Sequence, residues 1–125
     1  MTRRIAVVLA VLFLASCGGS PTGPSDPIWT QAGTGDSVFG MPDRVKTVRI
    51  TGAYSGSSSN FIVWAGDANA ACGVQIHASC RLLVNELLGS LFNAPTYTGT
   101  VQTGGGGTVT VKNSSGVSWT FTEVR

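Results

Sequence analysis

The segment Val117-Ser118-Trp119-Thr120-Phe121-Thr122-Glu123-Val124 decides the fold class, because apolar and polar residues alternate along it. Val117, Trp119 and Phe121 fall on one face of an extended chain, and the hydroxyl side chains between them fall on the other. This period of two residues is typical of a strand that buries one face and exposes the other to water. The segment therefore predicts a β-strand at the end of the chain, with Trp119 in the core.

Six earlier segments have a similar composition, rich in Val, Ile, Thr and aromatic residues, with clusters of Gly, Ser and Asn between them. We expect these strands at Asp36–Phe39, Arg44–Tyr54, Asn60–Ala65, Arg81–Leu88, Thr96–Gln102 and Thr108–Lys112. The stretch Leu82–Leu91 could alternatively form an amphipathic helix, because Leu and Glu permit one. Gly89 would end such a helix early, so a strand is favoured there.

The connections between these strands are short. Ser55–Ser59, Gly104–Gly107 and Asn113–Gly116 each join two predicted strands in five residues or fewer. Short connections favour pairing of strands that follow one another along the chain. The sequence therefore predicts an all-β domain, either a small antiparallel β-sandwich or a partly closed up-and-down barrel of about seven strands.

The first sixteen residues have the composition of an export signal. Arg3 and Arg4 precede an unbroken apolar run, Ile5–Ala15. A helix needs about 20 apolar residues to cross a bilayer, so this run is too short to remain as a membrane span. It fits the apolar core of a signal peptide that is removed after export.

The residues that follow, Leu14-Ala15-Ser16-Cys17, resemble the lipobox of bacterial membrane lipoproteins. The resemblance implies cleavage before Cys17 and acylation of Cys17 on its sulfur and its amine, with palmitate or similar chains that hold it in the membrane. It implies a protein of the bacterial cell envelope. Gly18, in place of an aspartate, implies the outer membrane if the organism has two membranes. A conventional signal cleaved near Ala15 is the alternative.

The next stretch, Gly18–Pro27, reads GGSPTGPSDP and has the composition of a flexible linker. Ten such residues span at most about 35 Å, so the β-domain at 28–125 is expected to stay near the membrane.

Two of the eight basic residues, Arg3 and Arg4, lie in the signal, and the other six equal the acidic residues in number. A nearly neutral domain without a basic face is a poor match for nucleic acid, which excludes that class of partner.

The cysteines that follow Cys17 predict a disulfide. Cys72 and Cys80 lie in the long connection Gly66–Ser79 or at its end, and an exported protein keeps such a pair oxidised. The alternative is a metal site made by Cys72, His77 and Cys80. Structural zinc takes four ligands, so we favour the disulfide and expect no metal and no cofactor.

Catalytic motifs are not recognisable in this chain, and we expect a protein that is not an enzyme. His77 is the only histidine, so a Ser-His-Asp triad would have to use it. The segment Gly52–Gly56 has the wrong spacing for a nucleophile elbow. The acidic residues are scattered along the chain rather than paired.

The predicted strand Asn60–Ala65 is apolar on both faces, which leaves Trp64 either covered by a second layer or exposed to a ligand. We expect a functional surface around Trp64, Asp67 and His77, because long ordered loops on a rigid scaffold often bind. The favoured function is a non-enzymatic module that binds a ligand or an envelope partner. One alternative is a carbohydrate- or peptidoglycan-binding module, in which a sugar stacks on Trp64 and is bound by Asn60 and Asp67. Another is a periplasmic enzyme inhibitor or small hydrolase that uses the disulfide-bounded loop.

Overall fold

The computed structural model describes residues 27–66, 72, 80–105 and 107–125. The predicted signal, the lipobox, most of the linker, Asp67 and His77 lie outside these residues. The described residues form eight strands and one short 3-10 helix, η2 (Ser90–Phe92). The strands are β1 (Thr30–Thr34), β2 (Ser37–Gly40), β3 (Thr47–Ala53), β4 (Ser59–Gly66), β5 (Arg81–Leu88), β6 (Thr96–Gln102), β7 (Thr108–Lys112) and β8 (Ser118–Glu123).

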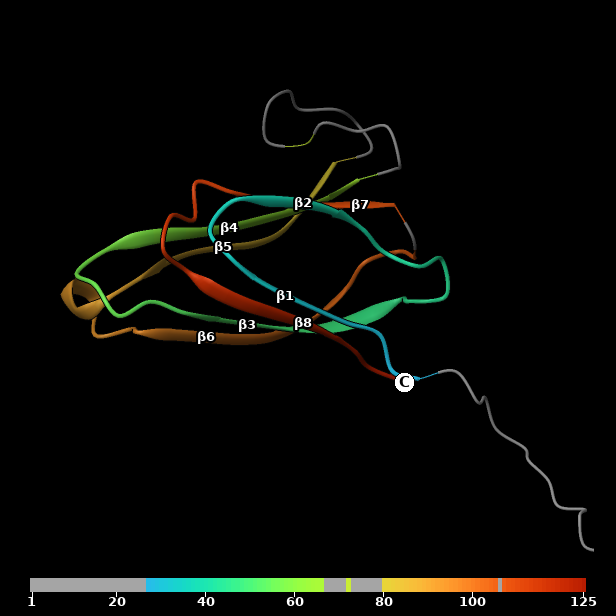
Figure 1. The fold of residues 1–125 in the computed structure, drawn as a ribbon, viewed down its shortest axis with the longest axis horizontal. Coiled ribbons are helices and arrows are strands. Elements are labelled where there is room, and N and C mark those ends of the chain that lie inside the picture. The colour runs from blue at the N-terminus through green and yellow to red at the C-terminus, as the bar shows by residue number, and fades with distance from the viewer. Residues whose placement is uncertain (1–26, 67–71, 73–79, 106) are drawn as a thin grey trace, which may run out of the picture.

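The strands form two antiparallel sheets of four strands that lie face to face (Figure 1). One sheet has the order β1-β8-β3-β6 and the other has the order β2-β7-β4-β5. This arrangement confirms the predicted β-sandwich, and its strand order is that of a jelly roll. The alternative, a partly closed up-and-down barrel, is wrong, because the two sheets are separate layers.

Two strand predictions need correction. The sequence pattern missed β1, whose small side chains include Gly33; a Cβ atom at Gly33 would lie 2.6 Å from the indole ring of Trp119. Only glycine fits beside the ring at position 33. A β-branched residue there would have indicated a strand, and its absence is one reason why the pattern missed β1. The strand predicted from Arg44 begins only at Thr47, because a turn precedes it, in which the Val45 N–H donates to the Pro42 carbonyl.

The other strand predictions hold. β5, β6 and β7 have the expected bounds, and the helix considered for Leu82–Leu91 does not form. β2, β4 and β8 differ from the expected bounds by one residue at one or both ends. The alternating pattern therefore located most of the sandwich.

The predicted pairing of successive strands is wrong. Among the described strands, β4 and β5 are the only consecutive pair that are neighbours within one sheet. Every other connection carries the chain from one sheet to the other. A short connection can do this because packed sheets lie only about 10 Å apart. Loop length therefore identifies neighbours in space without showing whether they share a sheet.

An aromatic cluster joins the two sheets. Phe39 of β2 lies 5.4 Å from Trp119 and 5.2 Å from Phe121 of β8, measured between ring centroids. Trp29, just before β1, lies 6.2 Å from Phe39. Trp119 is buried, as the sequence predicted. Edge and offset contacts of this kind are favourable beyond the area they bury, so the cluster binds the layers together.

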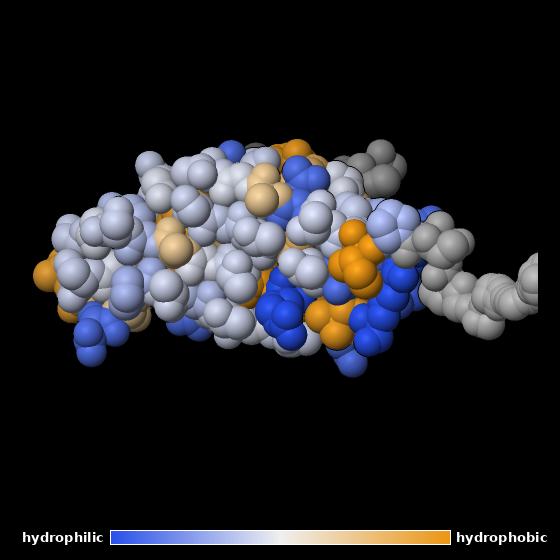
Figure 2. All heavy atoms as spheres, turned by 60° about the horizontal axis from the view of Figure 1, so that its bottom comes forward, coloured by the Kyte–Doolittle hydropathy of each residue, from blue (hydrophilic) through white to orange (hydrophobic). Residues whose placement is uncertain are grey.

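The outer face of the β1-β8-β3-β6 sheet is rich in threonine and poor in charge. Nine threonines alternate with the inward residues of this sheet: Thr30, Thr34, Thr47, Thr51, Thr96, Thr98, Thr100, Thr120 and Thr122. Arg49 is the single charged residue among the outward positions of these strands. Figure 2 shows this surface as a pale, mostly polar face. Threonine suits an exposed strand because it is β-branched and carries a hydroxyl.

The two ends of the sandwich differ in what they carry. One end of the sandwich holds Pro27, where the described domain begins, and Arg125, and we call it the terminal end. The β2–β3 and β6–β7 connections and the start of β5 also lie there. At the far end lie η2 and the β1–β2, β3–β4 and β7–β8 connections. The β4–β5 connection also leaves from the terminal end, since Ala65 pairs with Arg81.

Buried Glu123 holds the terminal end together. Its carboxylate accepts a hydrogen bond from the Trp29 N–H at 2.9 Å and from the Arg125 Nε at 2.9 Å, and Arg44 lies 3.5 Å away. Arg44 and Arg125 also donate to the Pro27 carbonyl. The hydrogen bonds from Arg125 and from Trp29 hold the pKa of Glu123 below its usual value, although burial opposes this. While it is ionised, the carboxylate therefore joins the segment before β1 to the segment after β8.

Glu123 should make the stability of the domain depend on acid pH. A carboxyl group with a lowered pKa stabilises the fold above its unfolded pKa of about 4.3, and this contribution is lost as pH falls through the folded pKa. We expect the Tm of the wild type to drop as pH falls below about 4. Glu123→Gln should have a lower Tm at neutral pH and a flatter profile in acid, measured by circular dichroism. Exposed Glu86→Gln is the control and should keep the wild-type profile; an equally steep profile for Glu123→Gln would contradict the assignment.

Candidate functional site

The structure places two of the four predicted binding residues on one face of β4. Asn60 and Trp64 both point away from the core, because Phe61, Val63 and Ala65 on the same strand are buried. Asn60 is exposed and Trp64 is half-buried. Asp67 and His77 lie outside the described residues. The candidate site is therefore the outer face of the β2-β7-β4-β5 sheet around Asn60 and Trp64.

Trp64 belongs to a row of side chains that crosses all four strands of this sheet. Val38 pairs with Thr110, Thr110 pairs with Trp64, and Trp64 pairs with Leu82. Val38 is 67% exposed and Leu82 is 43% exposed, while Thr110 between its larger neighbours is buried. Large apolar side chains exposed together in this way are unusual in a solvated sheet and indicate a binding surface.

A β-bulge builds this row. The register between β4 and β5 shifts after Val63, so that Val63 pairs with Val84 but Trp64 pairs with Leu82. The extra residue, Leu83, packs against the core, and Leu82 is left on the outer face beside the indole. Bulges often redirect a side chain next to a functional surface. The irregularity therefore enlarges the apolar area around Trp64.

Asn60 lies at the polar end of the same face. It lines an open hollow of about 660 Å³ at the far end, together with Asp36, Asn113 and Ser115. Asp36 also accepts a hydrogen bond from the backbone N–H of Ser114 at 2.8 Å, which fixes the carboxylate. Thr34 also lines the hollow, which thus offers one carboxylate, two carboxamides and two hydroxyls. These groups donate and accept hydrogen bonds in the combinations that a polyhydroxylated ligand requires.

The rest of the outer face is mixed in character. Ile62, between Asn60 and Trp64, pairs with Lys112 on one side and with Asn85 on the other. Asn60 and Trp64 are four residues apart on an extended strand, or about 13 Å. An apolar platform and a polar hollow therefore lie at a fixed distance on a rigid sheet, which suits an elongated ligand with both apolar and hydroxyl surfaces.

Sequence reasoning missed four members of this site. Val38, Leu82, Asp36 and Asn113 come from other segments and reach the site only through the strand order and the bulge. For Val38, alternation in the segment 37–40 was the one available signal, because it places Val38 on the opposite face from Phe39. Alternation gives no such signal for Leu82, since it would place Leu82 on the same face as buried Val84. No local signal marks Asp36 or Asn113, whose positions depend on the β1–β2 and β7–β8 connections.

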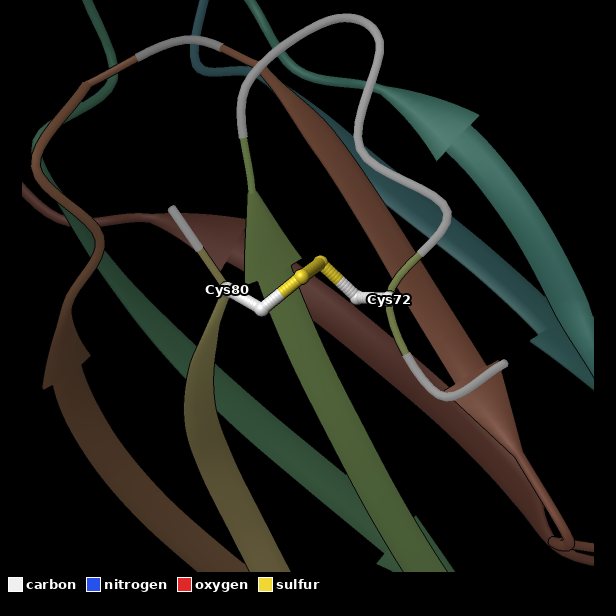
Figure 3. The surroundings of a disulfide bond; sticks show 2 residues. All are labelled: Cys72 and Cys80. Atoms are coloured by element: carbon white, nitrogen blue, oxygen red, sulfur yellow. A yellow bond between two sulfur atoms is a disulfide. The ribbon is translucent and has the colours of Figure 1, made fainter. Parts of the chain in front are cut away.

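Cys72 and Cys80 form a disulfide, as predicted, with their Cα atoms 5.7 Å apart. Figure 3 shows the two side chains meeting beside the end of β4, where Cys80 leads into β5. The bond uses both sulfurs that the alternative metal site would need. Among the residues that the structure describes, no group of three His, Cys, Asp or Glu side chains could hold a metal ion.

Removal of this disulfide should destabilise the domain without unfolding it. It closes a loop with a sequence separation of eight residues, and loop-closure entropy predicts a loss of about 2–3 kcal/mol. We expect this loss for the double variant Cys72→Ala/Cys80→Ala in urea unfolding. The Leu91→Ala variant, which changes a 71% exposed residue, is the control and should match the wild type. Equal stability of the double variant and the wild type would show that the bridge does not constrain the unfolded chain.

Within the part of the chain that the structure describes, no helix is long and apolar enough to span a membrane. Comparisons with protein-family models, with curated proteins and with solved structures found no match for this chain.

Proposed function

We propose that this chain is a lipid-anchored protein of the bacterial cell envelope whose β-sandwich binds an envelope glycan and has no catalytic role. The observation that carries the glycan proposal is the pairing of Trp64 with the polar hollow at Asn60 on one sheet face. Sugars present an apolar face that stacks on an indole and hydroxyl groups that hydrogen-bond to amides and carboxylates. A peptidoglycan strand has both features along its length.

The anchoring part of the proposal rests on the lipobox Leu14-Ala15-Ser16-Cys17 and on the linker that follows it. A chain acylated at Cys17 and joined to the domain by a ten-residue linker, Gly18–Pro27, would hold the domain within about 35 Å of the bilayer. The polar hollow lies at the far end of the sandwich, opposite Pro27. A glycan layer above the membrane would meet that end of the protein first.

Among the alternatives, glycan binding has the most support from described residues. Inhibition of an enzyme through the connection 67–79 would depend on residues outside them. A hydrolase would need converging acidic groups, but Glu123 is buried in ion pairs at the terminal end and Asp36 lies at the far end. The outer face of the other sheet also has an open hollow, of about 690 Å³, which half-buried Tyr97 and buried Trp119 line together with threonines. That hollow has no carboxylate or carboxamide side chain to bind sugar hydroxyls.

Binding to purified peptidoglycan tests the glycan proposal. We expect the protein to sediment with insoluble peptidoglycan and to release when soluble fragments of it are added. Trp64→Ala should weaken binding about tenfold or more, as loss of a central aromatic contact does at other interfaces. Asn60→Ala should weaken it about fivefold through the lost hydrogen bond.

The control is Thr98→Ala, which changes a matching exposed strand position on the opposite sheet. It should bind like the wild type. A wild type that does not sediment, or binding that is the same for Trp64→Ala and Thr98→Ala, would rule out this surface as a glycan site.

The anchoring proposal predicts a lipid on Cys17. Mass spectrometry of the native protein should find Cys17 as the first residue, with a mass increase that corresponds to acyl chains. Cys17→Ser should leave the precursor unprocessed and without lipid. An unmodified N-terminus at Ser16 or Gly18 would contradict the proposal.

A further inference from the structure

The basic residues of the domain are concentrated near the terminal end. Six basic residues follow the predicted signal, and five of them lie on connections, chain ends or strand positions in the half of the sandwich nearest that end: Arg44, Lys46, Arg49, Arg81 and Arg125. All five are exposed. The sixth, Lys112, ends β7 toward the far end. Most of the basic residues of the domain therefore lie near one end, which corrects the expectation of a domain without a basic face.

Two connections bring several of these cations close to one another. A Cβ atom placed on Gly105 would lie 2.6 Å from the Nζ of Lys46, and one placed on Gly104 would lie 4.0 Å from a guanidinium nitrogen of Arg81. The β6–β7 connection thus lies between the two side chains. Arg44 and Arg125 meet at the Pro27 carbonyl on the same end.

The carboxylates at this end offset part of the positive charge, because Glu123 pairs with Arg44 and Arg125, and the described residues give Lys46, Arg49 and Arg81 no ion pair. Glu123 has a side chain that is 4% exposed, beneath Arg44 and Arg125. Asp43, in the β2–β3 connection, is the exposed acidic side chain that the structure describes there. Asp26 and Asp67 lie outside the described residues. Asp36 and Glu86 lie on the far half.

An apolar residue completes the surface. Ile28, next to Pro27, is 49% exposed, and Trp29 behind it is half-buried. Figure 2 shows strongly hydrophilic and strongly hydrophobic residues side by side at this end, against the pale threonine-rich remainder. Cations next to exposed apolar groups are the composition of protein surfaces that lie on membranes.

We propose that the terminal end is a membrane-docking surface that binds anionic phospholipid, with Arg44, Lys46, Arg49, Arg81 and Arg125 facing the headgroups. This inference rests on the proposed lipid anchor. Arg44 and Arg125 of this surface donate to the Pro27 carbonyl, and a linker from acylated Cys17 would join the domain there, so the bilayer is the partner within reach. Tethering gives a high effective concentration of lipid, so that a few cations suffice for docking. A lipid chain and a basic patch together form a two-part membrane attachment.

Quenching of tryptophan fluorescence measures the docking. The acylated protein is reconstituted into vesicles that contain brominated phosphatidylcholine, either alone or with about one third phosphatidylglycerol. Docking brings Trp29 to the brominated chains, so quenching should be strong in the anionic vesicles and weak in the neutral ones. Added salt should reverse it, because it screens exposed charges. Trp29→Phe should remove the quenching and so identify its source.

Substitution of the basic residues tests whether this surface is the one that docks on the membrane. Each basic residue near an anionic bilayer contributes about a fivefold preference for the docked state, so Lys46→Gln/Arg49→Gln/Arg81→Gln should lower the docked-to-free ratio roughly a hundredfold. The matched control is Lys112→Gln, which should dock like the wild type. If the triple variant fails to fold, loss of quenching when salt is added to the wild type still shows that exposed charges drive the docking.

Two results would overturn the inference. One is equal quenching in neutral and anionic vesicles, and the other is a triple variant that folds and docks as well as Lys112→Gln. A protein that does not enter vesicles at all would show that the anchor itself is absent. That outcome is visible before quenching is measured, so the two failures are distinguishable.

Discussion

The contact between Phe39 and the aromatic side chains of β8 is the interaction on which the sandwich depends. Phe39 comes from one sheet, Trp119 and Phe121 come from the other, and their ring centroids are 5.2–5.5 Å apart. Gly33 leaves space for one of these rings, because it lies against Trp119. Gly52 does the same for Phe61, a buried ring of the opposite sheet. With two layers held in this way, each sheet has a free outer face that can take a separate role.

Those free surfaces divide the molecule into regions of different chemistry. The β1-β8-β3-β6 sheet presents threonines and little charge, which suits contact with water. The opposite sheet presents Trp64 and leads to the hollow at Asn60, and the terminal end carries cations around Pro27. The polar hollow at Asn60 and the proposed lipid surface thus lie at opposite ends of one rigid body. A protein that docks on the membrane by its terminal end would leave Asn60 accessible, whereas Trp64 pairs with Leu82, next to Arg81, and would lie close to the headgroups.

Alternation of residues predicted the strands, the sandwich and the burial of Trp119, because a half-buried strand must repeat with a period of two. It could not predict β1, since Gly33 is dictated by a ring 86 residues away in the sequence. It also placed Asn60 and Trp64 on one face correctly. The strand order and the bulge at Val63 decide which neighbours join them, and neither leaves a local pattern. The site was therefore predictable within one strand and not across strands.

The position of β8 in the sheet has a consequence for how the chain acquires its structure. β8 is the last strand, yet it lies between β1 and β3 and forms ladders with both. The first strand therefore has no partner until the C-terminal residues are available, and such distant pairings form slowly. The β1-β8-β3-β6 sheet cannot be completed before β8 has been made. Under the proposed export, transport machinery that accepts only unfolded polypeptides would receive such a chain in a competent state, and the fold would close after release.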